Sequence, residues 1–348
     1  MRALTVRPGE PGSLRIDDVE PPRPRPDQIL VRARALGVCG TDREIVDGEY
    51  GTAPAGRERL ILGHESLGTV ESAPAGSGFA PGDTVVGIVR HPDPVPCSSC
   101  AVGEWDMCRN GDYTEHGIKE RDGFGAELYA LDVDHAVRVD PDLGITAVLL
   151  EPASVLAKAW DHIERIGQRA AWNPERVLVT GAGPVGLLAA LLGVQRGLDV
   201  HVFDHAQGGP KPELVRDLGG TFHNGTVEEI GVLPDIVLEC TGVPALVVDV
   251  MGRNAPAGIV CLAGLSPGLR TIGVDVAGLN RSMVLENDVI FGSVNANRRH
   301  YELAAGALAA ADRGWLERLI TRRLPLERFA DALEKVKGDV KTVIDFAA

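Results

Sequence analysis

One segment constrains the fold of this chain more than any other, because three glycines mark the passage from an apolar strand to an apolar helix. It reads VLVTGAGPVG, from Val177 to Gly186. Gly181 permits a tight turn, Gly183 lets the backbone approach a pyrophosphate, and Gly186 lets the helix pack closely on the strand. The helix N-terminus then offers free N–H groups to phosphates. The segment predicts a dinucleotide-binding turn, in preference to an ordinary glycine turn of an α/β domain.

The next expected strand supports this interpretation, because it ends in the carboxylate of Asp204. An acid about twenty residues after the glycines can accept hydrogen bonds from the ribose hydroxyls of NAD, and it would repel a 2′-phosphate. No arginine follows directly, although Lys211 and His205 could contact a phosphate. We therefore predict NAD or NADP as cofactor, with NAD preferred. The predicted cofactor-binding residues are Gly181, Gly183, Pro184, Val185, Gly186, Asp204, His205, Lys211 and Thr241.

The sequence changes rhythm along its length. Residues 1–150 are mainly strand-like, residues 151–295 alternate helices with short apolar strands, and the remainder returns to helix and short strand. Apolar strands that alternate with helices imply a parallel sheet covered on both faces. At about 150 residues per domain, 348 residues suggest about two domains. We predict one domain of residues 1–150 plus 296–348, and a second of residues 151–295 inserted into it.

Composition excludes several classes of function. The chain has 35 Lys and Arg against 49 Asp and Glu, a formal net charge of −14, which disfavours nucleic-acid and membrane partners. The first residues lack the apolar region of a signal peptide, and we find no apolar run near the ~18 residues of a membrane span. Six cysteines are too few for a disulfide scaffold. We expect a cytoplasmic protein that acts on a small molecule.

Three separated residues could ligate a metal ion. Cys39 lies in CGTD and His64 in GHE, each after a strand-like segment, and Glu151 opens the first helical region. A thiolate, an imidazole and a carboxylate suit zinc, and three protein ligands leave a fourth position for water or substrate, as in catalytic zinc sites. An isolated cysteine is more often a buried apolar residue. Sequence separation by itself does not show that the three converge.

The order of these motifs resembles that of the zinc-dependent medium-chain alcohol dehydrogenases. CGTD, GHE, PGDTV and the glycine turn follow one another over most of the chain. The segments VRHP (89–92), TEHGIKE (114–120), DGF (122–124) and GSVN (292–295) are similar to those of the glucose 1-dehydrogenase branch. The resemblance implies an α/β plus β architecture, in which a GroES-like, β-rich catalytic domain carries an inserted Rossmann domain with a doubly wound parallel sheet.

Roles for the metal-site residues follow from this resemblance. It implies that Cys39, His64 and Glu151 are the ligands of a catalytic zinc ion, with Glu65 as an alternative or transient ligand. It also implies that Asp42 holds the second ring nitrogen of His64 and so fixes its tautomer.

The resemblance further implies the reaction. Thr41 would pass the proton of the substrate hydroxyl towards solvent. Glu115 and Asn295 would lie near the sugar or the nicotinamide, unless they are only a solvated loop carboxylate and a strand-end turn. Hydride would pass from C1 of an aldose, glucose first, to NAD(P)⁺ and give an aldonolactone. Another polyol, a cyclitol or an aminosugar stays open as the substrate.

Two other functions are alternatives to a zinc-dependent dehydrogenase. A zinc-free reductase on the same fold would lack the cysteine, histidine and glutamate set, whereas a non-catalytic cofactor-binding protein stays open on sequence alone. The resemblance also implies a homo-oligomer, either a dimer or a tetramer, in which the strand expected at Val289–Val294 pairs across a twofold axis.

A second metal site would be incomplete. The resemblance implies a structural zinc lobe with four cysteines spaced C-x2-C-x2-C-x7-C. Cys97, Cys100 and Cys108 supply the last three, and Pro94, which cannot ligate, occupies the first position. The neighbouring Asp93 could supply an oxygen. Three outcomes stay open: zinc with Asp93 as fourth ligand, an empty lobe held by packing, and a disulfide formed on oxidation.

Overall fold

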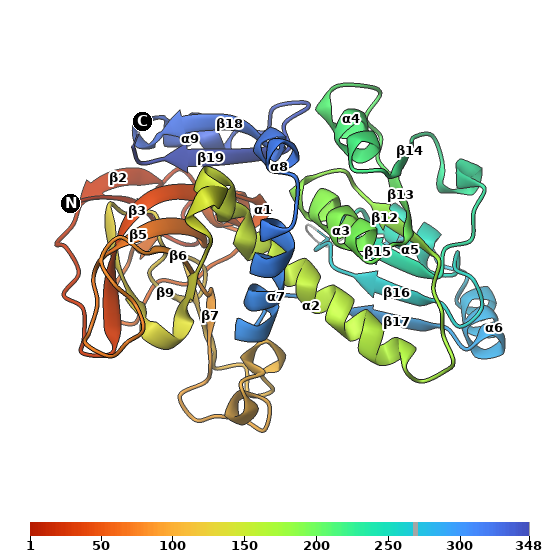
Figure 1. Cartoon of the computed structure of the whole chain (residues 1–348), viewed down its shortest axis with the longest axis horizontal. Coiled ribbons are helices and arrows are strands. Elements are labelled where there is room, and N and C mark those ends of the chain that lie inside the picture. The colour runs from red at the N-terminus through yellow and green to blue at the C-terminus, as the bar shows by residue number, and fades with distance from the viewer. Residues whose placement is uncertain (267–270, 348) are drawn as a thin grey trace. The chain divides into compact units, whose positions relative to one another are not determined.

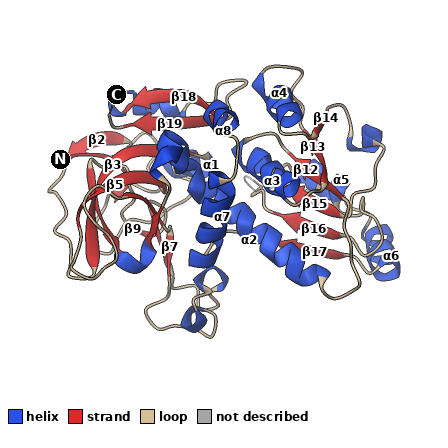
Figure 2. Cartoon of the chain, viewed as in Figure 1, coloured by secondary structure: helices blue, strands red, loops and turns tan. Residues whose placement is uncertain are grey.

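Strands dominate the chain up to residue 138, and helices alternate with strands between residues 150 and 292 (Figure 2). The computed structural model describes residues 1–266 and 271–347. It divides into two units, the first comprising Met1–Ser154 with Asn295–Ala348 and the second Val155–Val294 (Figure 1). The domain limits expected from the sequence, after residues 150 and 295, stay a prediction.

The first unit is organised around one long strand, β3 (Gln28–Val38). Apolar and polar residues alternate along its first half, which buries one face of the sheet. It pairs with β5 along one edge, and with β10 and then β19 along the other, so the C-terminal strand lies beside the N-terminal region (Figure 1). The remaining strands of this sheet are β5 (Glu65–Ser72), β6 (Thr84–Gly87), β10 (Leu128–Asp132), β11 (Ala136–Arg138), β18 (Ile320–Pro325) and β19 (Lys341–Asp345).

Two small sheets and several helices complete this unit in the part of the chain that the structure describes. The sheets have the orders β2-β1-β4 and β7-β8-β9. Their strands are β1 (Arg2–Val6), β2 (Arg15–Asp18), β4 (Leu60–Ile61), β7 (Arg90–His91), β8 (Thr114–His116) and β9 (Glu120–Arg121). The helices are α1 (Gly40–Val46), α7 (Arg298–Ala309), α8 (Arg313–Leu319) and α9 (Phe329–Leu333), with 3-10 turns η1 (Cys100–Val102), η2 (Trp105–Met107), η3 (Val133–His135), η4 (Pro141–Leu149) and η6 (Leu326–Arg328).

The second unit contains a parallel sheet, and among the described residues its strand order is β14-β13-β12-β15-β16-β17. This is the doubly wound order, in which the chain direction across the sheet reverses next to the first strand and opens a crevice there. The strands are almost wholly apolar because both faces are covered. They are β12 (Arg176–Thr180), β13 (Asp199–Phe203), β14 (Thr221–His223), β15 (Ile236–Glu239), β16 (Ile259–Leu262) and β17 (Val289–Gly292).

The helices of the second unit differ in how deeply they are buried. α3 (Pro184–Gln195) is apolar all round and packs on β12 and β13, as expected for a core helix. α6 (Val276–Glu286), which we did not predict, buries none of its residues. The others are α4 (Pro210–Asp217) and α5 (Pro244–Val250), with the turn η5 (Val227–Ile230); α2 (Leu150–Gly167) contains the boundary between the units.

One stretch corrects the sequence analysis. The run Pro141–Gly167 is long and apolar enough to cross a membrane, and we overlooked it because Gly144 and Pro152 interrupt its apolar residues. Of its most apolar window, 83% is buried inside the protein, as in the core helix of a soluble protein.

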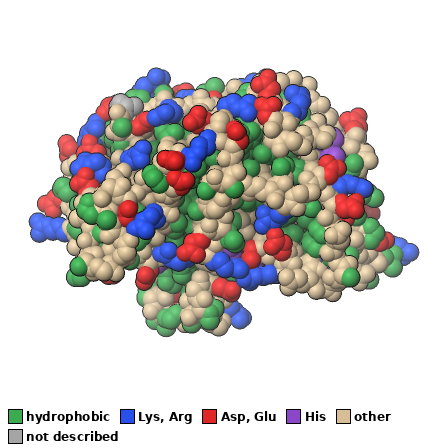
Figure 3. Space-filling model, viewed as in Figure 1, with side chains coloured by type: hydrophobic (Ala, Val, Ile, Leu, Met, Phe, Trp, Pro, Cys, Tyr) green, Lys and Arg blue, Asp and Glu red, His purple; other side chains and the backbone are tan. Residues whose placement is uncertain are grey.

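Charged side chains of both signs are interspersed on the face seen in Figure 3. No extended basic surface forms on that face, although the chain carries 35 Lys and Arg. Extended basic surfaces are the electrostatic feature that binds nucleic-acid backbones.

Candidate active site

Two neighbouring strands bring Cys39 and His64 together. Cys39 directly follows β3 and is the N-cap of α1, while His64 directly precedes β5. Because the two strands are antiparallel, with Gly37 opposite Glu65, the end of one meets the start of the other. Cys39 Sγ lies 3.1 Å from His64 Nε2, and one ligand atom each from Cys39, His64 and Glu65 lie within 4.8 Å of one another.

Asp42 holds this arrangement from behind. One carboxylate oxygen accepts a hydrogen bond from Cys39 N at 2.9 Å, and the other lies 3.3 Å from His64 Nδ1. Burial by itself would raise the pKa of Asp42, but its interactions with His64, Cys39 N and Lys341 together outweigh burial and keep that pKa below its usual value. A partner at Nδ1 fixes the ring and leaves Nε2 facing the cluster, as in carboxylate–histidine–metal triads.

A buried lysine, Lys341, accompanies the cluster, and the sequence analysis missed it. Lys341 begins β19, forms an ion pair with Glu65, and donates to the carbonyl of Val38 at 3.1 Å. A Cβ at Gly37 would lie 2.0 Å from the same carboxylate, so glycine there makes room for Glu65. A fully buried lysine nearly always has a partner. The sequence could not identify Glu65 as that partner, because the two residues are 276 positions apart and no local motif links them.

Glu151 lies at the start of α2, buried, and is not a member of the three-residue group. Burial raises its pKa to about 7, with His64 lowering that value and Glu65 raising it. These interactions place Glu151 within electrostatic range of the cluster.

The donor set fits a zinc ion. With Zn–S near ~2.3 Å and Zn–N near ~2.0 Å, a sulfur and a nitrogen on one tetrahedral ion lie roughly 3.5 Å apart. The 3.1 Å between Cys39 Sγ and His64 Nε2 is close to that value, and a carboxylate oxygen of Glu65 lies within 4.8 Å of both residues' ligand atoms. A soft thiolate, a neutral imidazole and a carboxylate are also the ligand types that zinc takes.

The two residues predicted to bind substrate are in direct contact. Asn295 Nδ2 donates to Oε1 of the buried Glu115 at 2.7 Å, although 180 residues separate them. Asn295 adopts a left-handed conformation, with φ of 62°, which is uncommon outside glycine and is found at functional sites. Thr41 lies on the first turn of α1, half-buried, two residues after Cys39.

The three lobe cysteines also gather. Ligand atoms of Cys97, Cys100 and Cys108 lie within 4.8 Å of one another, and all three thiols are free. Asp93 is buried but is not a member of this group; its Oδ1 accepts from Val95 N at 2.7 Å. Its Oδ2 is buried without a hydrogen-bond partner among the described residues. Zinc in this lobe, with Asp93 as fourth ligand, stays a prediction.

In the second unit the glycine turn has the geometry that a dinucleotide needs. Gly181 has φ of 88°, and a Cβ at Gly186 would lie 1.7 Å from the carbonyl oxygen of Gly181. A Cβ at Gly183, in contrast, would have nothing within 4 Å, so that glycine leaves open space. Gly183 is the N-cap of α3 without a side-chain cap, and Pro184 and Val185 begin the helix, whose first N–H groups are available to phosphates.

Asp204 lies next to this turn. Its Oδ2 accepts from Ala182 N at 2.7 Å and pairs with Lys211 Nζ at 3.2 Å, while Oδ1 accepts from Ala206 N at 2.9 Å. The exposed His205 follows Asp204 and contacts the Phe203 ring edge-on. The second unit therefore brings the carboxylate and its lysine to the glycine turn.

Thr241 approaches the turn from β15 and depends on a residue that the sequence analysis missed. A Cβ at Gly181 would lie 2.8 Å from Thr241 Cγ2. The fully buried Glu239 accepts hydrogen bonds from Thr180 Oγ1 at 3.1 Å and from Thr241 N at 2.8 Å. Glu239 thus ties the loops that follow β12 and β15. The sequence feature that could have indicated this role is a glutamate at the end of an otherwise apolar strand.

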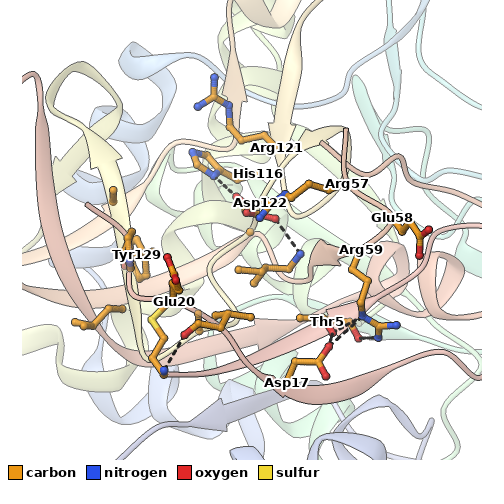
Figure 4. Close-up of a pocket in the computed structure, with 18 residues that line it drawn as sticks. Thr5, Asp17, Glu20, Arg57, Glu58, Arg59, His116, Arg121, Asp122 and Tyr129 are labelled. Atoms are coloured by element: carbon orange, nitrogen blue, oxygen red, sulfur yellow. Dashed lines mark hydrogen bonds and ion pairs between the residues drawn. The ribbon is translucent and has the colours of Figure 1, made fainter. Parts of the chain in front are cut away.

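A separate cavity of about 710 Å³ lies in the first unit, and none of the predicted site residues lines it (Figure 4). Four of its charged groups pair with one another: Arg57 with Asp122, and Arg59 with Asp17 at 3.1 Å. This cavity therefore lies outside the candidate active site.

The two units together define a class of protein. A β-rich unit with clustered cysteine, histidine and glutamate, combined with a doubly wound sheet and its glycine turn, is the architecture of the zinc-dependent medium-chain alcohol dehydrogenases. The alcohol dehydrogenase GroES-like domain family matches residues 25–141, and the glucose dehydrogenase C-terminus family matches residues 144–346. The chain belongs to the glucose dehydrogenase family. The predicted family and fold class are therefore confirmed.

Relatives match over the whole chain. The glucose 1-dehydrogenase of Methanocella arvoryzae is 40% identical over 100% of both chains, and glucose 1-dehydrogenase 1 of Caldivirga maquilingensis is 39% identical over 99% of both. Among solved structures, Haloferax mediterranei glucose dehydrogenase in complex with NADP, Zn and gluconolactone has a TM-score of 0.92 and 29% identity over 100% of both chains.

Proposed function

We propose that this protein is a zinc-dependent dehydrogenase that oxidises C1 of an aldose, glucose first, with NAD(P)⁺ and releases an aldonolactone. The observation that carries the proposal is the convergence of Cys39 Sγ, His64 Nε2 and the Glu65 carboxylate within 4.8 Å. Relatives named glucose 1-dehydrogenase, and a solved relative bound to NADP, Zn and gluconolactone, support the substrate class. Another polyol, a cyclitol or an aminosugar is the alternative substrate.

Cys39, His64 and Glu151 hold the zinc ion in this proposal. Lys341 already engages the carboxylate of Glu65, which favours Glu151 as the resident ligand and Glu65 as the alternative. Zinc supplies, when bound, a Lewis acid for the alcohol oxygen, and the nicotinamide accepts the hydride. Asp42 keeps Nε2 of His64 directed at the cluster.

Oxidation removes a hydride from C1 of the sugar and a proton from its hydroxyl. Thr41, on the first turn of α1 beside Cys39, receives that proton and passes it towards solvent. Glu115 and Asn295, which contact each other, bind the remaining hydroxyls of the ring. A neutral polyol suits the carboxylates of Glu65, Glu115 and Glu151 better than an anionic substrate.

NAD is the preferred cofactor in this proposal. The Asp204 carboxylate at the end of β13 can accept hydrogen bonds from ribose hydroxyls and repels a 2′-phosphate. Lys211, paired with Asp204 at 3.2 Å, is the group that would favour NADP. The ratio of kcat/KM for the two cofactors tests this preference, and a strong preference for NADP would contradict the role of Asp204.

A homo-oligomer, dimer or tetramer, is also part of the proposal. β17 is an edge strand of the parallel sheet, and α6, which precedes it, leaves Val276, Val284 and Leu285 largely exposed. An unpaired sheet edge beside exposed apolar residues is a template for pairing with a second chain. Light scattering of the protein as it leaves a size-exclusion column measures the mass of the oligomer.

The six free cysteines suit a reducing compartment, which supports a cytoplasmic location.

A metal count combined with an absorbance assay at about 340 nm, the band of reduced nicotinamide, tests the function. We expect glucose to give the highest kcat/KM in a panel of aldoses and polyols. Cys39→Ala and His64→Ala should each lose turnover and one zinc per chain while the cofactor still binds. Cys261→Ala, which removes a buried thiol of the second unit, is the matched control and should keep both. Full turnover in Cys39→Ala and His64→Ala would overturn the zinc assignment.

A further inference from the structure

Arg90 is a buried arginine held from three sides. It lies on β7 opposite Glu115 of β8, and its Nε and Nη2 both lie 3.0 Å from Glu115 Oε1. Its Nη1 donates to the backbone carbonyl of Asp106 at 3.2 Å, and its guanidinium lies 3.8 Å from the centre of the Tyr113 ring. A planar guanidinium with this set of partners has little freedom to change direction.

The hydrogen bonds to the Glu115 carboxylate all end on one of its two oxygens, Oε1. Arg90 and Asn295 Nδ2 all bind Oε1, and no recorded hydrogen bond among the described residues ends on Oε2. A carboxylate oxygen has about two lone pairs, so Oε1 is saturated while Oε2 keeps its full capacity to accept. The contacts of Oε1 therefore fix the direction of the side chain, and Oε2 can accept a hydrogen bond from a ligand.

Asp106 ties this pair to the cysteine lobe. It lies on η2, between Cys100 and Cys108 in the sequence, and is buried. Its carbonyl accepts from Arg90, while its Oδ1 accepts from Asn297 Nδ2 at 2.7 Å. Asn297 follows Asn295 by two residues and caps α7. One residue of the lobe thus holds both segments that contact Oε1 of Glu115.

We infer that Arg90, fixed by Asp106, is a positioning residue that directs Oε2 of Glu115 at a hydroxyl of the sugar. The inference rests on the proposed function, because it assumes that Glu115 binds the sugar. It assigns to the cysteine lobe a part in substrate recognition. The ligand recognised at Oε2 is a neutral group that donates a hydrogen bond, because the charge of Glu115 is already paired with Arg90.

A double-mutant cycle on the zinc-loaded enzyme tests the inference. Glu115→Gln and Arg90→Met should each raise KM for glucose about tenfold or more, since hydrogen bonds to charged groups contribute strongly. KM for the cofactor should not change. Because Arg90 acts through Glu115, the double variant should be no worse than Glu115→Gln alone. Arg90→Lys, which keeps the charge but not the planar fork, should give an intermediate KM.

The controls separate positioning from folding. Arg59→Met removes a partly buried arginine of the same unit, one that pairs with Asp17, and should leave KM for glucose unchanged. If Arg90→Met does not fold, the cycle is run with Arg90→Lys. Additive effects on KM, or an equal rise of both KM values, would overturn the inference while the proposed function stands. A wild-type enzyme that binds zinc and cofactor but oxidises no sugar would instead overturn the proposed function, and the inference with it.

Discussion

Lys341 and Glu65 form an ion pair in which the two side chains are only 1% and 2% exposed. The lysine comes from the C-terminal strand β19 and the glutamate from the first position of β5. Each charge is acceptable in the interior only because the other is present, since an uncompensated buried charge is strongly destabilising. This pair therefore affects both the stability of the first unit and the charge beside the predicted zinc ligands.

Replacing Lys341 with Met should destabilise the protein by about 3–5 kcal/mol, because it leaves the buried Glu65 carboxylate unpaired. Urea unfolding with zinc present measures the loss. The double variant Lys341→Met with Glu65→Gln removes both charges and should recover most of the stability. A single variant as stable as the wild type would show that Glu65 does not need the lysine.

Gly186→Ala should abolish cofactor binding. The added Cβ would lie 1.7 Å from the carbonyl oxygen of Gly181, so the glycine turn must move. Gly183→Ala is the matched control for stability, because the Cβ there meets nothing within 4 Å. We expect it to fold normally but to bind cofactor more weakly, since the Cβ enters the space left for the pyrophosphate. Fluorescence titration with NADH separates the two effects, and tight binding by Gly186→Ala would contradict the model of the turn.

Acid should destabilise the first unit through buried histidines. Burial lowers the pKa of His135 to about 4 and that of His116 well below its usual value of 6.5. The unfolded chain binds protons below pH 6.5 and the folded chain does not, so the stability these groups contribute is complete above pH 6.5 and decreases as the pH falls towards 4. His135 contributes a loss of about 1.4 kcal/mol at about pH 5.5, and His116 adds to that loss in the same direction.

Urea unfolding near pH 7.5 and near pH 5.5, on either side of the usual histidine pKa, measures this dependence. His135→Asn should decrease the difference between the two pH values by roughly 1.4 kcal/mol, which is one group's share. His205→Asn, at an exposed histidine of the second unit, is the control and should leave the difference unchanged. An unaltered pH dependence in His135→Asn would contradict the assignment.

The cysteine lobe leads to a prediction about the number of zinc ions bound per chain. If Cys97, Cys100, Cys108 and Asp93 hold zinc, elemental analysis of the native protein gives about two zinc ions per chain, and Asp93→Ala lowers that number towards one. One zinc in the native protein would mean an empty lobe. Thiol titration under reducing conditions and in air then separates packing from disulfide formation.

The sequence predicted those parts of the site whose residues carry their own local signal. The glycines around Gly181 are recognisable because each meets a steric demand of a single turn, and Cys39 and His64 stand in short motifs at the ends of adjacent strands. Lys341 and Arg90 could not be predicted in this way. The partner of Lys341 lies 276 residues away and that of Arg90 lies 25 residues away on the neighbouring strand, and nothing in the residues next to either side chain reveals its partner.

The helix α6 shows a different limit. Its apolar residues are not gathered on one face, so the sequence shows no apolar stripe by which a helix is recognised. The strand expected at Val289–Val294 ends at Gly292. The run Pro141–Gly167 was missed for the opposite reason, because scattered small and polar residues hide how apolar it is.

The pairing of β19 with β3 has a consequence for biosynthesis. Because a chain is synthesised from its N-terminus, Cys39, His64 and Glu65 leave the ribosome long before Lys341 does. Until β19 has docked, the Glu65 carboxylate in the interior of this sheet lacks its counter-charge. Completion of the first unit therefore waits for β19, the last strand that the structure describes.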